Sequence, residues 1–117
     1  MTVTLAIVRL PALSTIPSWV FESDFFSITK TQDELSVVCL EKEVPSGARV
    51  ERGWKGLKVE GPLDFELTGI LSSLAQPLAE AKISIFAIST FDTDYILVKE
   101  ENLPNAIDIL SRFCKVE

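Results

Sequence analysis

A chain of 117 residues is long enough for one compact domain, or for two very small units that share a core. Its hydrophobic fraction of 47% predicts a folded interior. The formal net charge of -6 would repel nucleic-acid phosphates and anionic lipids, so neither nucleic acid nor a membrane surface is an expected partner.

The first half of the chain has the pattern of strands joined by turns. In chain order, the expected elements are a strand over residues 3–10, a short helix over 17–21, a hairpin formed by 25–31 and 34–40, and an extended segment over 50–59. Gly53 and Gly56 interrupt the extended segment, and a glycine inside a strand pattern indicates a bulge or a close backbone approach.

The second half predicts two amphipathic helices around another pair of strands. Apolar residues at helical spacing cover residues 65–81, with Asp64 as the N-cap, and Pro77 is expected to bend this helix or restart its last turn. Strands are expected at 83–89 and 95–99. A final helix would begin near Asn102, with an apolar stripe made of Leu103, Ala106, Ile107, Leu110 and Phe113. Helices would then cover one face of a mostly antiparallel sheet, which is an α+β fold.

One stretch of the first half is echoed about sixty positions later. Residues 26–29 match residues 86–89, and after a one-residue gap residues 37–45 match residues 96–104. Duplication of one unit is the economical explanation, and a chance likeness between strands rich in Val and Ile is the alternative. The copies have diverged, because the position of Asp94 falls near Leu35 in the first copy.

A polar loop between the last two strands is the best candidate for a binding site. Ser89, Thr90 and Phe91 supply hydroxyls and an aromatic face, and Asp94 supplies a carboxylate where the next strand begins. Loops held by rigid strands commonly carry binding groups. The alternative for Asp94 is an exposed turn carboxylate that caps the next backbone amide.

The start of the first long helix is the second candidate. Gly69 and Ile70 lie where a helix leaves backbone N–H groups unpaired, and such an end favours an anionic group. A cationic group at Asp94 and a carboxylate at this helix start would together fit an amino acid. Alternatively, Gly69 lets the helix pack against Trp54 or a neighbouring strand.

Catalysis has little support in this sequence. There is no histidine, which removes the commonest general base and transition-metal ligand, and neither a Gly-x-Ser-x-Gly turn nor a glycine-rich phosphate loop is present. We therefore expect no enzyme, no cofactor and no metal site. The N-terminus lacks a signal-peptide pattern, so a cytoplasmic location is expected.

Residues 83–98, together with 61–65 and 68–70, resemble ACT-domain proteins related to the CASTOR-type arginine-sensor family, and the likeness covers nearly the whole chain. It implies tandem ferredoxin-like (ACT) units with antiparallel sheets and helices packed on one face. The first unit would span 1–60 and the second 61–117, with the strand around 54–60 as a segment that both could share.

The resemblance also implies a function. A non-enzymatic regulatory protein would hold an amino acid, with arginine or another basic one as the candidate, at an interface between units. By position, Thr90, Phe91, Asp94, Gly69 and Ile70 would meet the ligand. This chain has one module where the sensor has two, so a homodimer is expected. The alternative is an interaction or oligomerisation module without a ligand.

Overall fold

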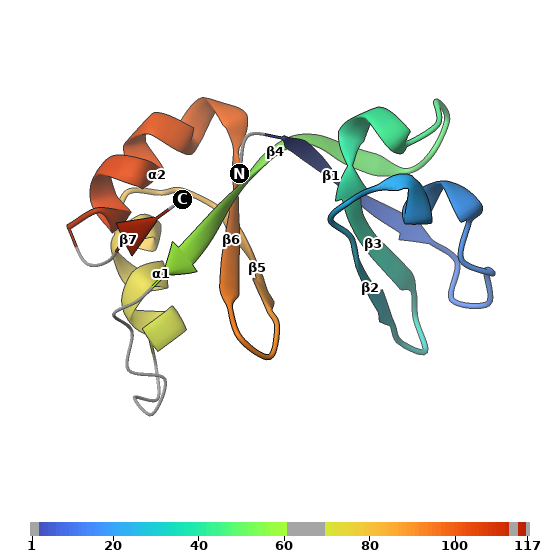
Figure 1. The fold of residues 1–117 in the computed structure, drawn as a ribbon, viewed down its shortest axis with the longest axis horizontal. Helices are drawn as coiled ribbons and strands as arrows, with labels where there is room; N and C mark the ends of the chain where they lie inside the picture. Colours follow the sequence, from blue (N-terminus) through green and yellow to red (C-terminus); the bar gives the residue numbers. More distant parts are fainter. Residues whose placement is uncertain (1–2, 61–69, 113–114, 117) are drawn as a thin grey trace. The chain divides into compact units, whose positions relative to one another are not determined.

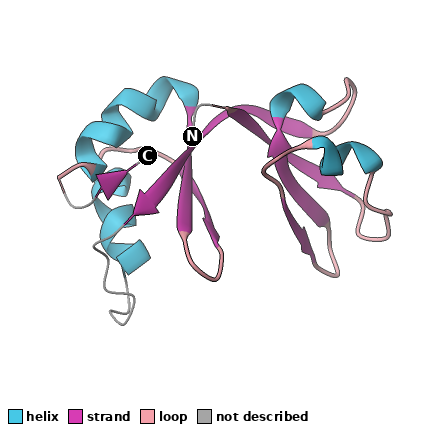
Figure 2. Cartoon of the chain, viewed as in Figure 1, coloured by secondary structure: helices cyan, strands magenta, loops and turns pink. Residues whose placement is uncertain are grey.

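A computed structural model describes residues 3–60, 70–112 and 115–116 (Figure 1). The chain divides into two compact units, Val3–Trp54 and the residues from Lys55 onward. Strands and short helices are present in both units (Figure 2). Of the described helices, none has the length and apolarity needed to cross a bilayer.

The N-terminal unit is built on a small antiparallel sheet. Its elements are the strands β1 (Thr4–Leu10), β2 (Ser27–Lys30), β3 (Leu35–Leu40) and the first part of β4 (Val50–Glu60), with the 3-10 turns η1 (Ser18–Glu22) and η2 (Glu41–Glu43). The strands lie in the order β2-β3-β1-β4, and β3 runs antiparallel to both of its neighbours.

Alternation along these strands produces the core of the N-terminal unit. Successive strand residues point to opposite faces, so every second residue of β1 and β3 is directed to the same side. Val20 from η1 and Val44 complete this cluster, whose buried members are Ala6, Val8, Val20, Leu35, Val37, Cys39 and Val44. Ser23 stabilises the edge of the core, because its buried Oγ accepts a hydrogen bond of 3.1 Å from the Leu40 amide.

The C-terminal unit has the same order of strands with longer helices. It contains the second part of β4, α1 (Ile70–Glu80), β5 (Ile85–Ser89), β6 (Asp94–Lys99), η3 (Glu100–Asn102), α2 (Leu103–Leu110) and β7 (Lys115–Val116). The strand order is β5-β6-β4-β7, with antiparallel pairing of β5 with β6 and of β4 with β7. One core joins strands and helices through Leu57, Val59, Leu78, Ile83, Ile96, Val98, Ala106, Ile109 and Leu110.

The helix α1 continues through Pro77 as far as Glu80, rather than restarting its last turn there. Lys82 ends it in the left-handed region with φ 61°, and the Lys82 and Ile83 amides donate to the carbonyls of Ala79 and Leu78 at 2.9 Å each. This pair of bonds is a Schellman motif with a lysine at the position that glycine usually occupies. The predicted N-cap Asp64 lies outside the described residues.

The predicted apolar stripe of α2 is wrong at Ile107. Ile107 is 40% exposed, whereas Ala106, Ile109 and Leu110 are buried and Leu103 packs against the same core. The helix has only 8 residues, so a single narrow stripe faces the strands, and Ile107 is turned about 100° away from Ala106. Asn102 occupies the N-cap position without a side-chain cap, because the chain enters α2 from η3. Phe113 lies outside the described residues.

The two predicted strand glycines differ. Gly53 has a positive φ of 78°, which favours glycine, and its amide donates to Glu41 Oε1 at 2.9 Å. Gly56 is buried in the same strand and has no positive φ. The strand β4 therefore carries one conformational irregularity, next to the boundary between the units at Trp54 and Lys55.

Candidate functional site

The loop between β5 and β6 is fixed at its base by strand pairing and at its tip by one threonine. Ser89 pairs with Asp94, which closes the hairpin. The Thr90 amide donates to the Thr93 carbonyl at 2.8 Å, the Thr90 hydroxyl donates to the same carbonyl at 3.1 Å, and the Thr93 amide donates to the Thr90 hydroxyl at 3.1 Å. The loop is therefore held in one conformation by its own hydrogen bonds.

Four of the predicted ligand-binding residues lie on this loop or at its ends. Phe91 is completely exposed, Ser89 and Thr90 are exposed, and Asp94 is half-buried at the start of β6. The amide and hydroxyl of Thr90 are used inside the loop, which leaves its carbonyl as the group it can offer outward.

The Asp94 carboxylate accepts no hydrogen bond from any described residue. Among the described residues it therefore does not cap a backbone amide, which was the alternative predicted for it. A half-buried carboxylate with this geometry can accept a charge-assisted hydrogen bond from a cation. Asp92 is exposed at the tip of the loop and has no such partner either.

The helix-start half of the predicted site is described only in part. Ile70 is the first described residue of α1 and belongs to the same unit as the loop. Gly69 lies outside the described residues, so the meeting of Gly69 and Ile70 with Asp94 stays a prediction.

The β2–β3 hairpin has a loop of the same construction. The Thr31 amide donates to the Glu34 carbonyl at 2.9 Å, and the Glu34 amide donates to the Thr31 hydroxyl at 3.2 Å. The partners Ile28 and Val37 in one hairpin correspond to Ala87 and Ile96 in the other, so the offset is 59 residues on both strands.

The one-residue gap predicted between the two segments is therefore wrong. Matching side chains by similarity placed Ile28 on Ile88, but strand register places it on Ala87. The signal that could have revealed the register is the threonine at the first loop position, Thr31 in one hairpin and Thr90 in the other.

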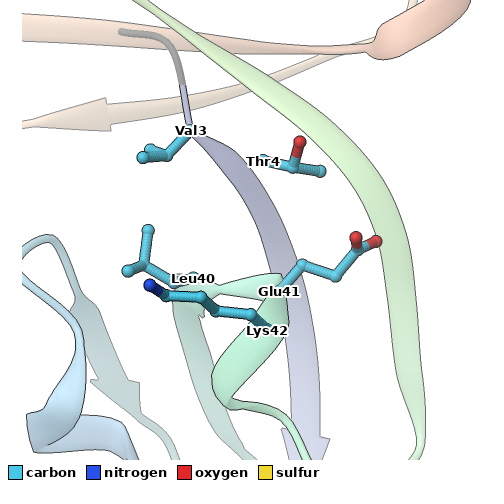
Figure 3. A pocket seen from close by; sticks show the side chains of 5 residues that line it. All are labelled: Val3, Thr4, Leu40, Glu41 and Lys42. Carbon is cyan, nitrogen blue, oxygen red and sulfur yellow. The ribbon is translucent and has the colours of Figure 1, made fainter.

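Two hollows lie in the N-terminal unit, and neither is lined by the predicted site residues. The first, of about 310 Å³, is lined by Val3, Thr4, Leu40, Glu41 and Lys42 (Figure 3). In Figure 3 the Glu41 carboxylate points toward β4, where its Oε1 accepts from Gly53, and the Arg52 guanidinium donates to the Glu41 carbonyl at 3.3 Å. Both hydrogen bonds join Glu41 to residues of β4.

The second hollow, of about 600 Å³, lies beside the β2–β3 loop. Ala12, Leu13, Lys30, Thr31 and Gln32 line it. No sequence pattern pointed to it, since it is formed where the irregular segment after β1 comes to the end of β2.

The described residues contain no group of three or more His, Cys, Asp or Glu side chains that could hold a metal ion. Cys39 is buried in the strand core, and this burial raises the pKa of its thiol above the ordinary value of 9.0. A buried thiol of raised pKa is a poor nucleophile.

Comparison with known proteins places the chain in a family. A family model described as an ACT domain matches residues 49–112, which is more than half of the chain. The protein therefore belongs to the ACT-domain family, as the resemblance in its sequence predicted, and its fold is of the α+β, ferredoxin-like ACT type. A second family model, described as an N-terminal domain, matches residues 4–47.

Three individual proteins illustrate the relationship. The chain is 33% identical over 96 residues to the human cytosolic arginine sensor for mTORC1 subunit 1, a match that covers 75% of this chain and 29% of that protein. A protein of known crystal structure from Agrobacterium tumefaciens is 43% identical, with a TM-score of 0.86 over 93% of this chain and 81% of that one.

The third is the regulatory subunit of aspartate kinase from Thermus thermophilus. It is 10% identical, with a TM-score of 0.64 over 93% of this chain and 90% of that one, and this likeness shows the fold alone. The chain spans 29% of the length of the human sensor, so it resembles one part of a longer protein.

Proposed function

We propose that this chain is a non-enzymatic regulatory protein that binds an amino acid through the loop between β5 and β6. The observation that carries the proposal is the half-buried Asp94 carboxylate, which accepts no hydrogen bond from any described residue. Pairing of Ser89 with Asp94 fixes the backbone that carries it. The ACT family and the human relative named as an arginine sensor favour an amino acid with a cationic group. That relative is named as cytosolic, and we propose the same location for this chain.

Each predicted residue has a distinct role in this proposal. Asp94 would pair with the cationic end of the ligand. Beside it, the Thr90 carbonyl would accept a hydrogen bond from the ligand, and the backbone of Phe91 would accept or donate one. Ser89 would add a hydroxyl. Gly69 and Ile70, at the start of α1, would approach the α-carboxylate or α-amine. An arginine or lysine side chain supplies the cation that Asp94 needs.

We further propose that the two units are tandem ACT-like repeats, close to 1–60 and 61–117, each with its helices on one face of its sheet. The shared strand order supports this, because β2-β3-β1-β4 and β5-β6-β4-β7 place equivalent strands in equivalent positions. The offset of 59 residues common to both strand pairs supports it as well. So do the two loops, in each of which a threonine amide donates to a carbonyl three residues later. The strand β4 contributes to both units.

The binding site would be completed by a second copy of the chain, with the ligand at an interface between ACT units. Two-fold pairs are the commonest soluble oligomers, which supports this proposal. Light scattering with and without amino acids should give twice the 12.9 kDa mass of the chain. A monomer mass at high micromolar concentration under both conditions would remove the homodimer.

A thermal-shift screen of the twenty amino acids tests the function. A ligand present at about 100 times its Kd stabilises the native state by about 2.7 kcal/mol, so a genuine ligand raises the melting temperature by several degrees. We expect arginine or lysine to do so, and neutral amino acids to do so less. An unchanged melting temperature with all twenty would reject the proposed function.

The alternative function is a protein-interaction or oligomerisation module without a ligand. The complete exposure of Phe91 favours it, because exposed aromatic side chains are enriched at protein interfaces. The substitution Phe91→Ser distinguishes the two functions. An interaction module would lose self-association, whereas an amino-acid binder would keep the response to its ligand with reduced affinity.

A further inference from the structure

The hollow beside the β2–β3 loop is an open surface depression, since four of the five residues that line it are exposed. Its volume of about 600 Å³ falls in the range of ligand pockets, which are mostly apolar with a few convergent polar groups. Ala12 and Leu13 provide the apolar part, and Lys30, Thr31 and Gln32 provide the polar part. All five residues belong to the N-terminal unit.

The loop beside this hollow repeats the backbone of the proposed amino-acid site with the opposite charge. Lys30 stands at the position of Ser89, and Leu35 at the position of Asp94. Leu35 is buried in the core, so the carboxylate that would attract a cation is missing here. Lys30 is exposed and has no ion pair with any described residue.

Two further observations reinforce the preference for an anion. The Arg9 guanidinium donates to the Asp33 carbonyl at 3.1 Å, which keeps a second cation at the loop. The acidic residues Asp33 and Glu34 are not among the residues that line the hollow. Lys30 is therefore the charged side chain that a ligand in the hollow would meet.

The apolar wall is exposed. Leu13 is 93% exposed, although removing a leucine side chain from water is favourable. A ligand with an aliphatic body would cover Leu13 and Ala12 while its charged end remained at Lys30. An ammonium at the same end would be repelled by Lys30.

We propose that this hollow is a second ligand site, for a small carboxylate with a branched aliphatic body. The carboxylate pairs with the Lys30 ammonium and accepts a hydrogen bond from the Gln32 side-chain amide, and the aliphatic body packs on Leu13 and Ala12. This site is separate from the loop that carries Asp94, and it extends the proposed function to a second class of ligand.

The probe for this proposal is 4-methylpentanoate, compared with the uncharged 4-methylpentanamide. Amide chemical shifts of the full chain in solution are followed as each probe is added. Saturable shifts at Leu13, Thr31 and Gln32 with the carboxylate, and weaker ones with the amide, are expected. Equal binding of both probes, or shifts confined to other residues, would overturn the proposal.

Substitutions then assign the contacts. Lys30→Gln should weaken binding of 4-methylpentanoate by about twofold to fivefold, the effect of losing an ion pair at an exposed lysine. Lys42→Gln is the matched control, because it removes an exposed lysine of the same unit that lines the other hollow. Leu13→Ser should weaken the probe without disturbing the fold, since Leu13 is exposed.

The Asp94→Asn variant separates this site from the proposed amino-acid site. It should bind 4-methylpentanoate like the wild type, whatever it does to arginine. Loss of the probe in Asp94→Asn, or in Lys42→Gln but not in Lys30→Gln, would place the carboxylate elsewhere and overturn the proposal. The amino-acid proposal is tested by a different ligand, so the two can fail separately.

Discussion

The β2–β3 and β5–β6 hairpins share a backbone but present different chemistry. Both have the same register, a loop of the same length and a threonine that binds its own loop through the amide and the hydroxyl. Where one hairpin has Lys30 and Leu35, the other has Ser89 and Asp94. Strand pairing and one threonine thus fix each loop, whereas the side chains at its ends differ in charge between the two hairpins.

The two units also differ in what covers their strands. The C-terminal unit has helices of 11 and 8 residues in its core, whereas the N-terminal unit has 3-10 turns of 5 and 3 residues. Equivalent strand positions are nevertheless buried in both, such as Val37 in one and Ile96 in the other. The strands therefore carry the core that the two units have in common.

The largest effect is expected from truncating the common core position. Ile96→Ala should lower the free energy of unfolding by about 2–5 kcal/mol, because it removes buried methyl groups and leaves a cavity. Val37→Ala removes about one methylene fewer, and about 0.8 kcal/mol per buried CH₂ should make its cost correspondingly smaller. Urea denaturation of both variants measures this. A larger cost for Val37→Ala than for Ile96→Ala would show that the two cores are not equivalent.

A somewhat smaller effect is expected where the N-terminal unit depends on a side chain. Ser23→Ala should lower the free energy of unfolding by about 1–3 kcal/mol, since it leaves the buried Leu40 amide without its acceptor. Ser46→Ala, at an exposed turn, is the control and should change the stability little. Denaturation curves that coincide for the two variants would mean that water replaces the Ser23 hydroxyl.

The threonine loops offer a matched pair. Thr31→Val and Thr90→Val each remove a hydroxyl that accepts a backbone amide of its own loop, at nearly constant side-chain volume. Each should cost about 0.5–1.5 kcal/mol, and the two costs should agree closely. Thermal unfolding of both variants checks this. A cost confined to one loop would break the structural equivalence of the hairpins.

The smallest effect concerns pH and the pair Cys39 and Val98, which occupy equivalent positions. Burial raises the pKa of the Cys39 thiol above its ordinary value of 9.0, so the unfolded chain loses the thiol proton at a lower pH than the folded chain does. Stability due to Cys39 is therefore complete below pH 9.0 and is lost as the pH rises from there toward the folded pKa. Unfolding measured from pH 7 to pH 11 should show a smaller alkaline decrease in Cys39→Val than in the wild type.

The strands β1 to β6 could be predicted from the sequence because alternation of apolar residues is a local signal. The strand β7 has only two residues, which is too short for such a pattern. The Ile107 error has a physical cause, since a short helix buries only the residues that its packing angle directs inward. Similar side chains in the two hairpins indicate an offset that differs by one residue from the true register, which the loop threonines Thr31 and Thr90 show. The hollow at Leu13 and Lys30 could not be predicted, because it depends on how an irregular segment approaches a strand end.

The composition of the loop between β5 and β6 indicates a candidate binding loop. The structure adds that the Thr90 hydroxyl is bonded within the loop and that no described residue pairs with Asp94. Sequence reasoning could indicate these residue types but not their hydrogen bonds, which depend on the register of Ser89 with Asp94.

Calorimetric titration of arginine into the wild type, Asp94→Asn and Asp92→Asn tests whether Asp94 binds the cationic end of an amino acid. Both substitutions remove one negative charge from the same loop, but only Asp94 is held at the strand pair. We expect Asp94→Asn to weaken arginine binding by about 1.5–3 kcal/mol, the scale of a hydrogen bond to a charged group, and Asp92→Asn to leave the affinity nearly unchanged. Binding that survives Asp94→Asn unaltered, or that falls equally in both variants, would contradict this expectation.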